Sequence, residues 1–264
     1  MCSTFQHLSS NYFLLLPLIF SCLLFSCSDK DENELSSTLQ AHVANNAELT
    51  LHEELVACAA GGQDDFLEDE NFPVSMFFYP ELEATNFAYY ETENSSDDPE
   101  DFSLFVKKDM DHEPLFNGFL RRFLLPPPTK DVWARVSFHA NDTLWVCKPV
   151  RLKYFENPTL YAPDFCAVNL TTPTEPTFTW QDEVPNENII YFQVISDADN
   201  NALSGTYTND LIFQYYQLDN VVFNVTRPGQ ATPLLPSENY NFTLMGVSDD
   251  NWVNLIADKS FVTQ

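Results

Sequence analysis

The chain has 264 residues, of which 39 are acidic and 12 are basic, so its formal net charge at pH 7 is -27. A charge of this sign repels nucleic acid backbones and anionic lipid headgroups, which excludes nucleic acid as an expected partner. With 23 Phe and 14% aromatic residues the chain can fill a hydrophobic core, so the acidity belongs to the surface of a globular protein.

The first predicted element is a secretory signal. Residues 12–26, YFLLLPLIFSCLLFS, are too short and too interrupted by Pro and Ser for a membrane span, but they fit the apolar segment of a signal peptide. The tetrapeptide LFSC that ends at Cys27 resembles the lipobox of bacterial lipoproteins, in which the peptide is cut before a cysteine that carries the lipid. The resemblance implies a lipoprotein signal peptide over residues 1–26 and a lipid anchor on Cys27.

Two features depart from that pattern. The segment before the apolar run has no Lys or Arg, and IFSC, which ends at Cys22, is a second lipobox-like tetrapeptide. Cys27 is preferred because the polar sequence starts only after it. An ordinary cleaved signal or a single membrane anchor remains the alternative.

An acidic tether is predicted next, over residues 27–47. Its first part, SDKDENE, contains Asp29, Asp31 and Glu32 and resembles the export signal that follows the lipidated cysteine in surface lipoproteins of the Bacteroidetes type. The resemblance implies a protein held by its lipid at the outer membrane and exposed on the cell surface. The periplasmic face of that membrane is the alternative.

Residues 48–156 are predicted to form a β-sandwich. Short β-like runs, the first of them LTLHEELVACAA, are separated by acidic or Pro-rich segments, and VWARVSFH at residues 132–139 alternates apolar and polar positions before a turn at residues 140–143. About seven strands in this length favour an immunoglobulin-like sandwich. Cys58 and Cys147 are the first disulfide pair to test, and the alternative leaves both of them and Cys166 unpaired.

Residues 157–264 are predicted to form a second sandwich. Trp180 matches the core tryptophan of fibronectin type III domains, LLPSENYNFTLMGVS places Tyr240 as their tyrosine corner, and KSFVT matches their closing strand. The segment 196–233 is longer than usual for the middle of that fold, so we expect an elaborated sheet there. The resemblance implies an all-β protein with two tandem sandwiches.

Motifs for catalysis, cofactors and metals are incomplete in this sequence. HEELV at His52 has Val56 where a zinc protease helix needs its second His. Asp197, Asp199 and Asn201 supply the first ligands of a calcium loop, but the required Gly and Glu do not follow, so an acidic turn is favoured. We therefore expect no metal, no cofactor and no enzymatic activity.

One loop is predicted to contact a ligand. Asp249, Asp250, Asn251 and Trp252 follow a predicted strand, and an indole beside carboxylate and amide groups can stack on a sugar ring while its neighbours bind hydroxyls. The alternative is that Trp252 folds back and covers the end of the sandwich.

These observations favour a non-enzymatic, membrane-anchored module that binds or adheres to a protein or glycan partner. Two alternatives remain open: a polysaccharide hydrolase with carboxylates brought together between the two domains, and a structural spacer of an envelope complex.

Overall fold

The computed structural model describes residues 37–62, 71–163, 165–181 and 188–264. Cys27, Asp29, Asp31, Glu32 and the signal peptide lie outside these residues. Among the residues that the structure describes, no helix is long and apolar enough to cross a membrane.

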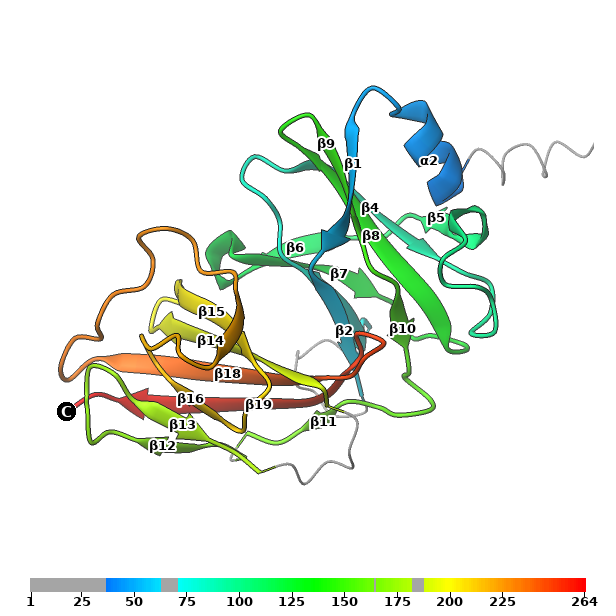
Figure 1. Ribbon diagram of the computed structural model, residues 1–264. Helices are drawn as coiled ribbons and strands as arrows, with labels where there is room; N and C mark the ends of the chain where they lie inside the picture. Colours follow the sequence, from blue (N-terminus) through cyan, green and yellow to red (C-terminus); the bar gives the residue numbers. More distant parts are fainter. Residues whose placement is uncertain (1–36, 63–70, 164, 182–187) are drawn as a thin grey trace, which may run out of the picture.

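Strands β1 to β10 form two sheets that face each other (Figure 1). Sheet A has the order β1-β9-β8-β4-β5, with β10 also paired to β8, and sheet B has the order β2-β3-β7-β6. The elements of this half are α2 (Leu39–Asn45), β1 (Thr50–Leu55), β2 (Ala57–Gly61), β3 (Val74–Phe78), β4 (Thr85–Glu91), η1 (Phe102–Leu104), β5 (Val106–Lys108), β6 (His112–Leu115), η2 (Phe116–Gly118), β7 (Leu120–Leu125), β8 (Val132–Ala140), β9 (Thr143–Cys147) and β10 (Val150–Leu152).

This first sandwich has the immunoglobulin-type arrangement. If β2, β3, β4, β6, β7, β8 and β9 are lettered A to G and β5 is counted as an added strand after C, sheet B has the order A-B-E-D and sheet A contains G, F and C side by side. The predicted run LTLHEELVACAA is one strand in sequence but two in space, because β1 pairs in parallel with β9 and β2 pairs antiparallel with β3. The hairpin turn between β8 and β9 is confirmed, with positive φ at Asn141 and Asp142.

Strands β11 to β19 form the second sandwich. Sheet C has the order β11-β19-β18-β14-β15-β17, and sheet D has the order β12-β13-β16. The strands are β11 (Leu160–Tyr161), β12 (Ala167–Asn169), β13 (Thr177–Thr179), β14 (Ile190–Asp197), β15 (Ala202–Thr208), β16 (Ile212–Gln214), β17 (Val221–Asn224), β18 (Asn239–Val247) and β19 (Val253–Val262). The expected elaboration is present, because β16 crosses to sheet D and β17 returns to extend sheet C. The all-β class with two tandem sandwiches is confirmed.

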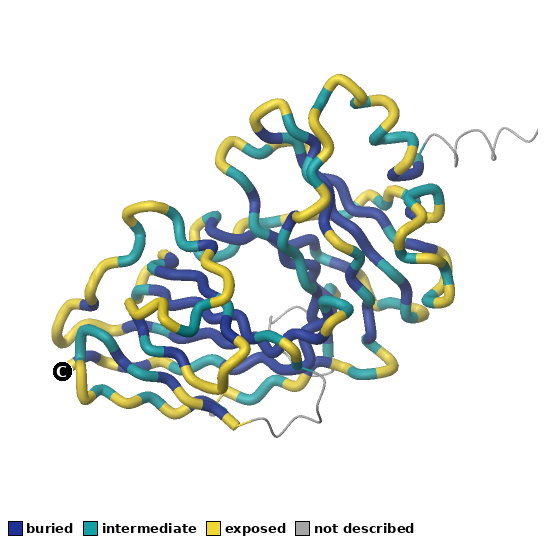
Figure 2. Tube along the Cα trace, in the orientation of Figure 1, coloured by how far each residue is buried: buried dark blue, intermediate teal, exposed yellow. Residues whose placement is uncertain are grey.

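Buried residues are concentrated in the strands, and exposed residues in the loops around them (Figure 2). The buried apolar side chains form separate clusters. One cluster lies between sheets A and B and contains Met76 and Phe138, and another lies between sheets C and D and contains Phe178 and Trp180. A third lies between sheets B and C, so the two sandwiches share an apolar interface. Its buried members are Ala60, Phe77, Phe119, Leu120, Phe192, Val194, Ala202, Val225, Met245, Val247, Val253 and Ile256.

The close fit of this interface is clearest at Gly205 in β15. A methyl group on Gly205 would overlap the ring of Phe119, which reaches across from the first sandwich. Sheets packed this closely through apolar side chains are rigid, in contrast to modules joined only by a linker. The two sandwiches are therefore held in one fixed arrangement.

The end of the predicted tether is folded. Helix α2 starts with Thr38, whose Oγ1 accepts a hydrogen bond from the backbone N–H of Ala41, and it buries Leu39 against the outer face of sheet A. Leu39 is fully buried beside Tyr90 and Phe105. Residues 39–45, which we expected in the tether, thus belong to the first sandwich.

The tyrosine corner is confirmed by its hydrogen bond. The backbone N–H of Leu235 donates to Oη of Tyr240 at 3.0 Å, and the Tyr240 ring lies in the core between sheets C and D. The hydroxyl therefore fixes the segment that leads into β18.

We expect Tyr240→Phe to lower the free energy of unfolding by about 1 to 3 kcal/mol, because the substitution leaves the Leu235 N–H without its acceptor. Chemical denaturation of the full chain measures this, since the second sandwich alone would expose the shared interface. Tyr216→Phe is the control, because Tyr216 is 45% exposed. A change below a few tenths of a kcal/mol would show that the Tyr240 bond does not stabilise the fold.

Candidate functional site

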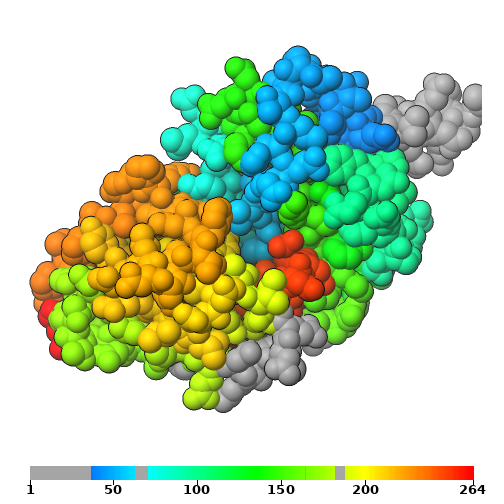
Figure 3. Space-filling model, in the orientation of Figure 1, coloured from blue at the N-terminus to red at the C-terminus, as the bar shows by residue number. Residues whose placement is uncertain are grey.

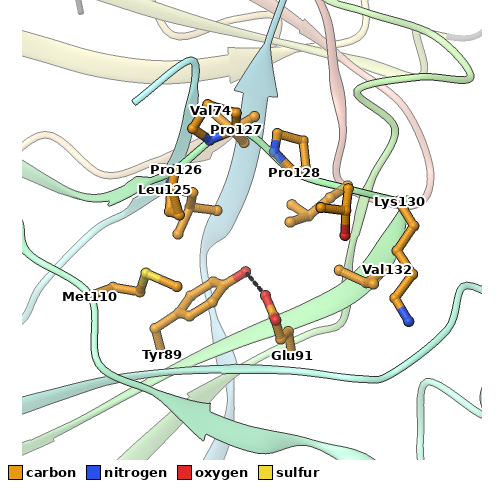
Figure 4. Close-up of a pocket in the computed structure, with 12 residues that line it drawn as sticks. Val74, Tyr89, Glu91, Met110, Leu125, Pro126, Pro127, Pro128, Lys130 and Val132 are labelled. Carbon is orange, nitrogen blue, oxygen red and sulfur yellow. Dashed lines mark hydrogen bonds between the residues drawn. The ribbon is translucent and has the colours of Figure 1, made fainter. Parts of the chain in front are cut away.

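The candidate site is a groove at one end of the first sandwich, where the edges of its core open between sheets A and B (Figure 4). Its volume is about 180 Å³. Both sheets and the connection from β7 to β8 line it, through Val74, Tyr89, Glu91, Met110, Leu125, Pro126, Pro127, Pro128, Thr129, Lys130, Val132 and Leu152.

The walls of the groove are apolar because alternating strand positions point into the sandwich. Val74, Leu125 and Val132 are buried members of the first core cluster, and they continue that core to the surface. Pro126 to Pro128 follow β7 without a break and form one wall, and their fixed φ angles make that wall stiff. The opening is therefore preformed and rigid.

The polar groups of the groove come from β4. Tyr89 and Glu91 are two residues apart, so they point to the same side of the strand, and Oη of Tyr89 donates to Oε2 of Glu91 at 3.2 Å (Figure 4). Burial, and then the neighbouring Glu91 carboxylate, raise the pKa of Tyr89 well above its usual value. The phenol thus stays protonated at neutral pH and donates its hydrogen to Glu91.

Lysines set the charge at the rim. Nζ of Lys108 lies 3.5 Å from Oε1 of Glu91, with both side chains partly exposed, and Lys130 lines the opening. The groove thus combines apolar walls with one carboxylate, one neutral phenol and ammonium groups near its mouth. Glu91 is the single carboxylate among the lining residues, whereas acid and base catalysis of glycoside hydrolysis usually needs two.

The size of the groove limits what it can hold. Pockets for drug-sized ligands usually have about 300 to 1,000 Å³, and a water molecule needs about 30 Å³. A groove of about 180 Å³ therefore suits one side chain or one ring that belongs to a larger partner. Tyr89 is fully buried, so it offers no exposed face on which a sugar could stack.

The structure corrects the prediction for Trp252. Its side chain is fully buried in the core between sheets A and B, and its Nε1 donates to the backbone oxygen of Asn157 at 2.7 Å. The ring cannot stack on a ligand, so the prediction of an exposed indole is wrong. The alternative, in which Trp252 folds back onto a sandwich, agrees better with the structure. The ring packs in the first sandwich, however, and not in the second, to which its loop belongs.

The neighbours of Trp252 hold the same loop against the first sandwich. The backbone oxygen of Asn251 accepts from Ala59 at 3.1 Å, and its side-chain Nδ2 donates to the oxygen of Pro149 at 3.0 Å. Asp250 forms an ion pair with Lys153 at 3.0 Å, and both side chains are largely buried. This loop is a structural contact between the sandwiches, and Asp249 is its exposed member.

A second hollow, of about 460 Å³, lies beside that loop and is lined by Asp249, Asp250, Lys153 and Glu156 among others. Its charges are already paired, because Asp250 contacts Lys153 and Oε2 of Glu156 accepts from Arg151 at 2.6 Å. The groove of Figure 4 has mainly apolar walls, whereas polar and charged groups line most of this hollow, so the groove is the better candidate site.

The structure also places the predicted acidic turn and the three cysteines. Asp197 Oδ1 accepts from the backbone N–H groups of Asp199 and Asn201, at 3.0 and 2.8 Å, which is the expected acidic turn. In the described part of the chain no group of three His, Cys, Asp or Glu side chains is placed to hold a metal. Cys58, Cys147 and Cys166 are all free thiols, so the Cys58 to Cys147 disulfide is absent.

The groove was not predicted from the sequence. Its residues are spread over β3, β4, β7, β8 and β10, and no local motif connects them. The run PPPTK was the available signal, because three prolines after a predicted strand form a stiff loop at a sandwich end.

No protein-family model matches the sequence, and a search of curated proteins finds no match. Among solved structures, the chain is similar to the FN1–FN3 domains of chicken CNTN1, with 10% identity, 82% of this chain and 68% of that one covered, and a TM-score of 0.30. It is also similar to a segment of two fibronectin type III domains from chicken tenascin, with 11% identity, 80% and 98% covered, and a TM-score of 0.25.

Proposed function

We propose that this protein is a lipid-anchored surface lipoprotein that binds another protein through the groove of its first sandwich. The observation that carries the proposal is the groove itself, whose apolar walls and single carboxylate suit an apolar side chain with a hydrogen-bond donor beside it. A protein partner is favoured over a glycan because Tyr89, the aromatic ring of the groove, is fully buried.

The fixed joint between the sandwiches supports presentation of such a site. A rigid binder loses little conformational entropy when it meets its partner, so weak contacts are enough for recognition. The lipobox-like sequence at Cys27 and the acidic residues after it support an anchor followed by a surface location.

The same rigidity favours a second candidate function, a structural spacer of an envelope complex. A spacer needs a constant distance between its ends, which the shared apolar interface supplies, but it needs no occupied groove. Binding at the groove therefore separates the two functions.

Panning a phage-displayed peptide library against the soluble chain after Cys27 tests binding. We expect selected peptides to share one apolar anchor residue, and we expect Thr129→Phe, which fills the mouth of the groove, to weaken them at least tenfold, or about 1.4 kcal/mol. The control is Thr85→Phe, which alters an exposed residue of β4 away from the groove.

A glycan array and a hydrolysis assay on polysaccharides complete the test. Binding of a glycan that is sensitive to Thr129→Phe would replace the protein partner by a sugar. If neither peptides nor glycans bind, the spacer function is favoured. Hydrolysis of a polysaccharide would instead favour the alternative that the protein is a hydrolase.

A further inference from the structure

Most edge strands in the described sheets are protected against pairing with another chain. An exposed edge offers unpaired backbone N–H and C=O groups, and proteins protect it with charge, Pro, short length or a covering segment. Strand β1 carries Glu53 and Glu54, β5 carries Lys107 and Lys108, and β6 contains Pro114.

The other edges are also protected. Strand β2 is covered by the loop before β19, because Ala59 forms a bridge with Trp252. Strands β10, β11, β12 and β16 have two or three residues each, and the part of β19 that β11 does not pair with carries Asp258 and Lys259.

Strand β17 differs from all of these edges. Its sequence, VVFN, has no charge and no Pro, and it pairs on one side with β15 and with no other described strand. Val222 is 57% exposed and Phe223 is 47% exposed. A bulge in the ladder between β15 and β17 adds twist at Val222, and no described strand pairs with the outer side of β17.

Apolar residues beside β17 extend this surface. Leu211, Ile212 and Leu218 are 38%, 45% and 54% exposed. The side chain of Asn220 holds the segments together, because its Nδ2 donates to the backbone oxygen of Ile212 at 2.8 Å. The gold-to-orange segment that contains these residues lies on the face of the second sandwich shown in Figure 3.

The charged side chains exposed beside the apolar residues are acidic, whereas the guanidinium of Arg227, which follows β17, packs against Tyr79 and Phe119 of the first sandwich. Asp210 and Asp219 are exposed beside the apolar residues, and the whole chain carries -27. A second copy of this chain would bring the same negative charge to the contact, whereas a segment with Lys or Arg would be attracted.

We propose that β17 binds an extended segment of a partner protein, apolar in its centre and basic at its ends, which adds to sheet C as a further strand. The backbone groups of β17 would supply the hydrogen bonds, and the side chains of Val222, Leu218 and Ile212 would cover the apolar centre of the segment. This site is separate from the groove in the first sandwich, so either site can exist without the other.

Strand β17 and helix α2 lie in different sandwiches. Helix α2, where the described chain begins, lies in the first sandwich, and the gold-to-orange segment with β17 lies in the second (Figure 1). Strand β17 thus lies in the sandwich that does not contain α2.

The probe is a synthetic peptide of alternating Val and Thr with Lys at both ends, and fluorescence anisotropy measures its binding to the full soluble chain. We expect saturable binding that a Val222→Lys variant weakens at least about tenfold. Val262→Lys is the matched control, because Val262 is 51% exposed in β19 of the same sheet and receives the same charge.

Two further peptides separate pairing from simple charge attraction. A peptide with the same Lys residues but with N-methyl groups on alternate backbone nitrogens should lose binding, and a peptide with Glu ends should bind at least about tenfold more weakly. Equal binding of the N-methylated peptide, or equal weakening by both variants, would overturn the proposal.

Analytical ultracentrifugation of the protein alone tests whether a second copy of this chain binds to β17 instead. We expect a monomer for the wild type. A dimer that Val222→Lys dissociates and Val262→Lys does not would overturn the proposal, because β17 would then be an interface between copies of this chain.

Discussion

Replacing Trp252 by Ala should lower the free energy of unfolding of the whole chain by about 3 to 5 kcal/mol, the usual range for truncation of a core Trp. The indole fills the core between sheets A and B, and its Nε1 bond to Asn157 would also be lost. Chemical denaturation followed by circular dichroism measures the change.

The neighbouring residue provides the control for this prediction. Asp249 is exposed in the same loop, so Asp249→Ala should change stability by less than about 0.5 kcal/mol. A loss below about 1 kcal/mol for Trp252→Ala would contradict the burial of the ring and would restore this loop as a candidate binding surface.

The place of Trp252 in the chain gives the experiment a second result. Trp252 belongs to the loop between β18 and β19 of the second sandwich, but it packs inside the first. We therefore expect both sandwiches to unfold in one transition, in the wild type and in the variant. Two separate transitions in the wild type would show that the shared interface does not couple them.

Cys27→Ala should abolish lipid labelling and remove the protein from the membrane fraction or leave it uncleaved. In the lipid attachment that we propose, the thioether forms from the cysteine thiol, and alanine has no group that can replace it. Each methylene of the lipid contributes about 0.8 kcal/mol when buried, so the difference between the variant and the wild type should be close to complete. Labelling with a radioactive fatty acid measures it.

Two variants control this experiment. Cys22→Ala alters the second lipobox-like sequence and should leave labelling unchanged; loss of label here instead would identify Cys22 as the anchor. Joint replacement of Asp29, Asp31 and Glu32 by Ala should leave the lipid in place but reduce cleavage by protease added to whole cells. Unaltered cleavage would contradict the export signal.

The second sandwich was the easier half to predict. Signals there are local in sequence. The hydroxyl of Tyr240 accepts a hydrogen bond from the backbone N–H of Leu235, which lies only five residues earlier in the chain. The alternation of residues 132–139 was equally informative, because a strand places successive side chains on opposite faces. Val132, Ala134, Val136 and Phe138 do share the core face of β8.

The other face of β8 shows where this reasoning ends. Alternation places Arg135 on the face opposite to Val136, and there its side chain is 1% exposed and donates to the backbone oxygens of Pro99 and Cys147, at 2.7 and 2.8 Å. Phe102 and Phe105 cover it, with the guanidinium carbon 4.9 and 5.3 Å from their ring centroids. Alternation separates two faces, but it does not say whether a distant segment covers the second one.

The sequence by itself determined the all-β class, the strands with strong alternation, the turn at residues 140–143 and the tyrosine corner, because each depends on residues close together in the chain. Only the tertiary structure decided that Trp252 fills the first sandwich, that sheets B and C share an interface, and that the groove opens between β4 and the prolines after β7. Burial is decided by contacts between residues far apart in sequence, and those contacts exist only once the sheets have packed.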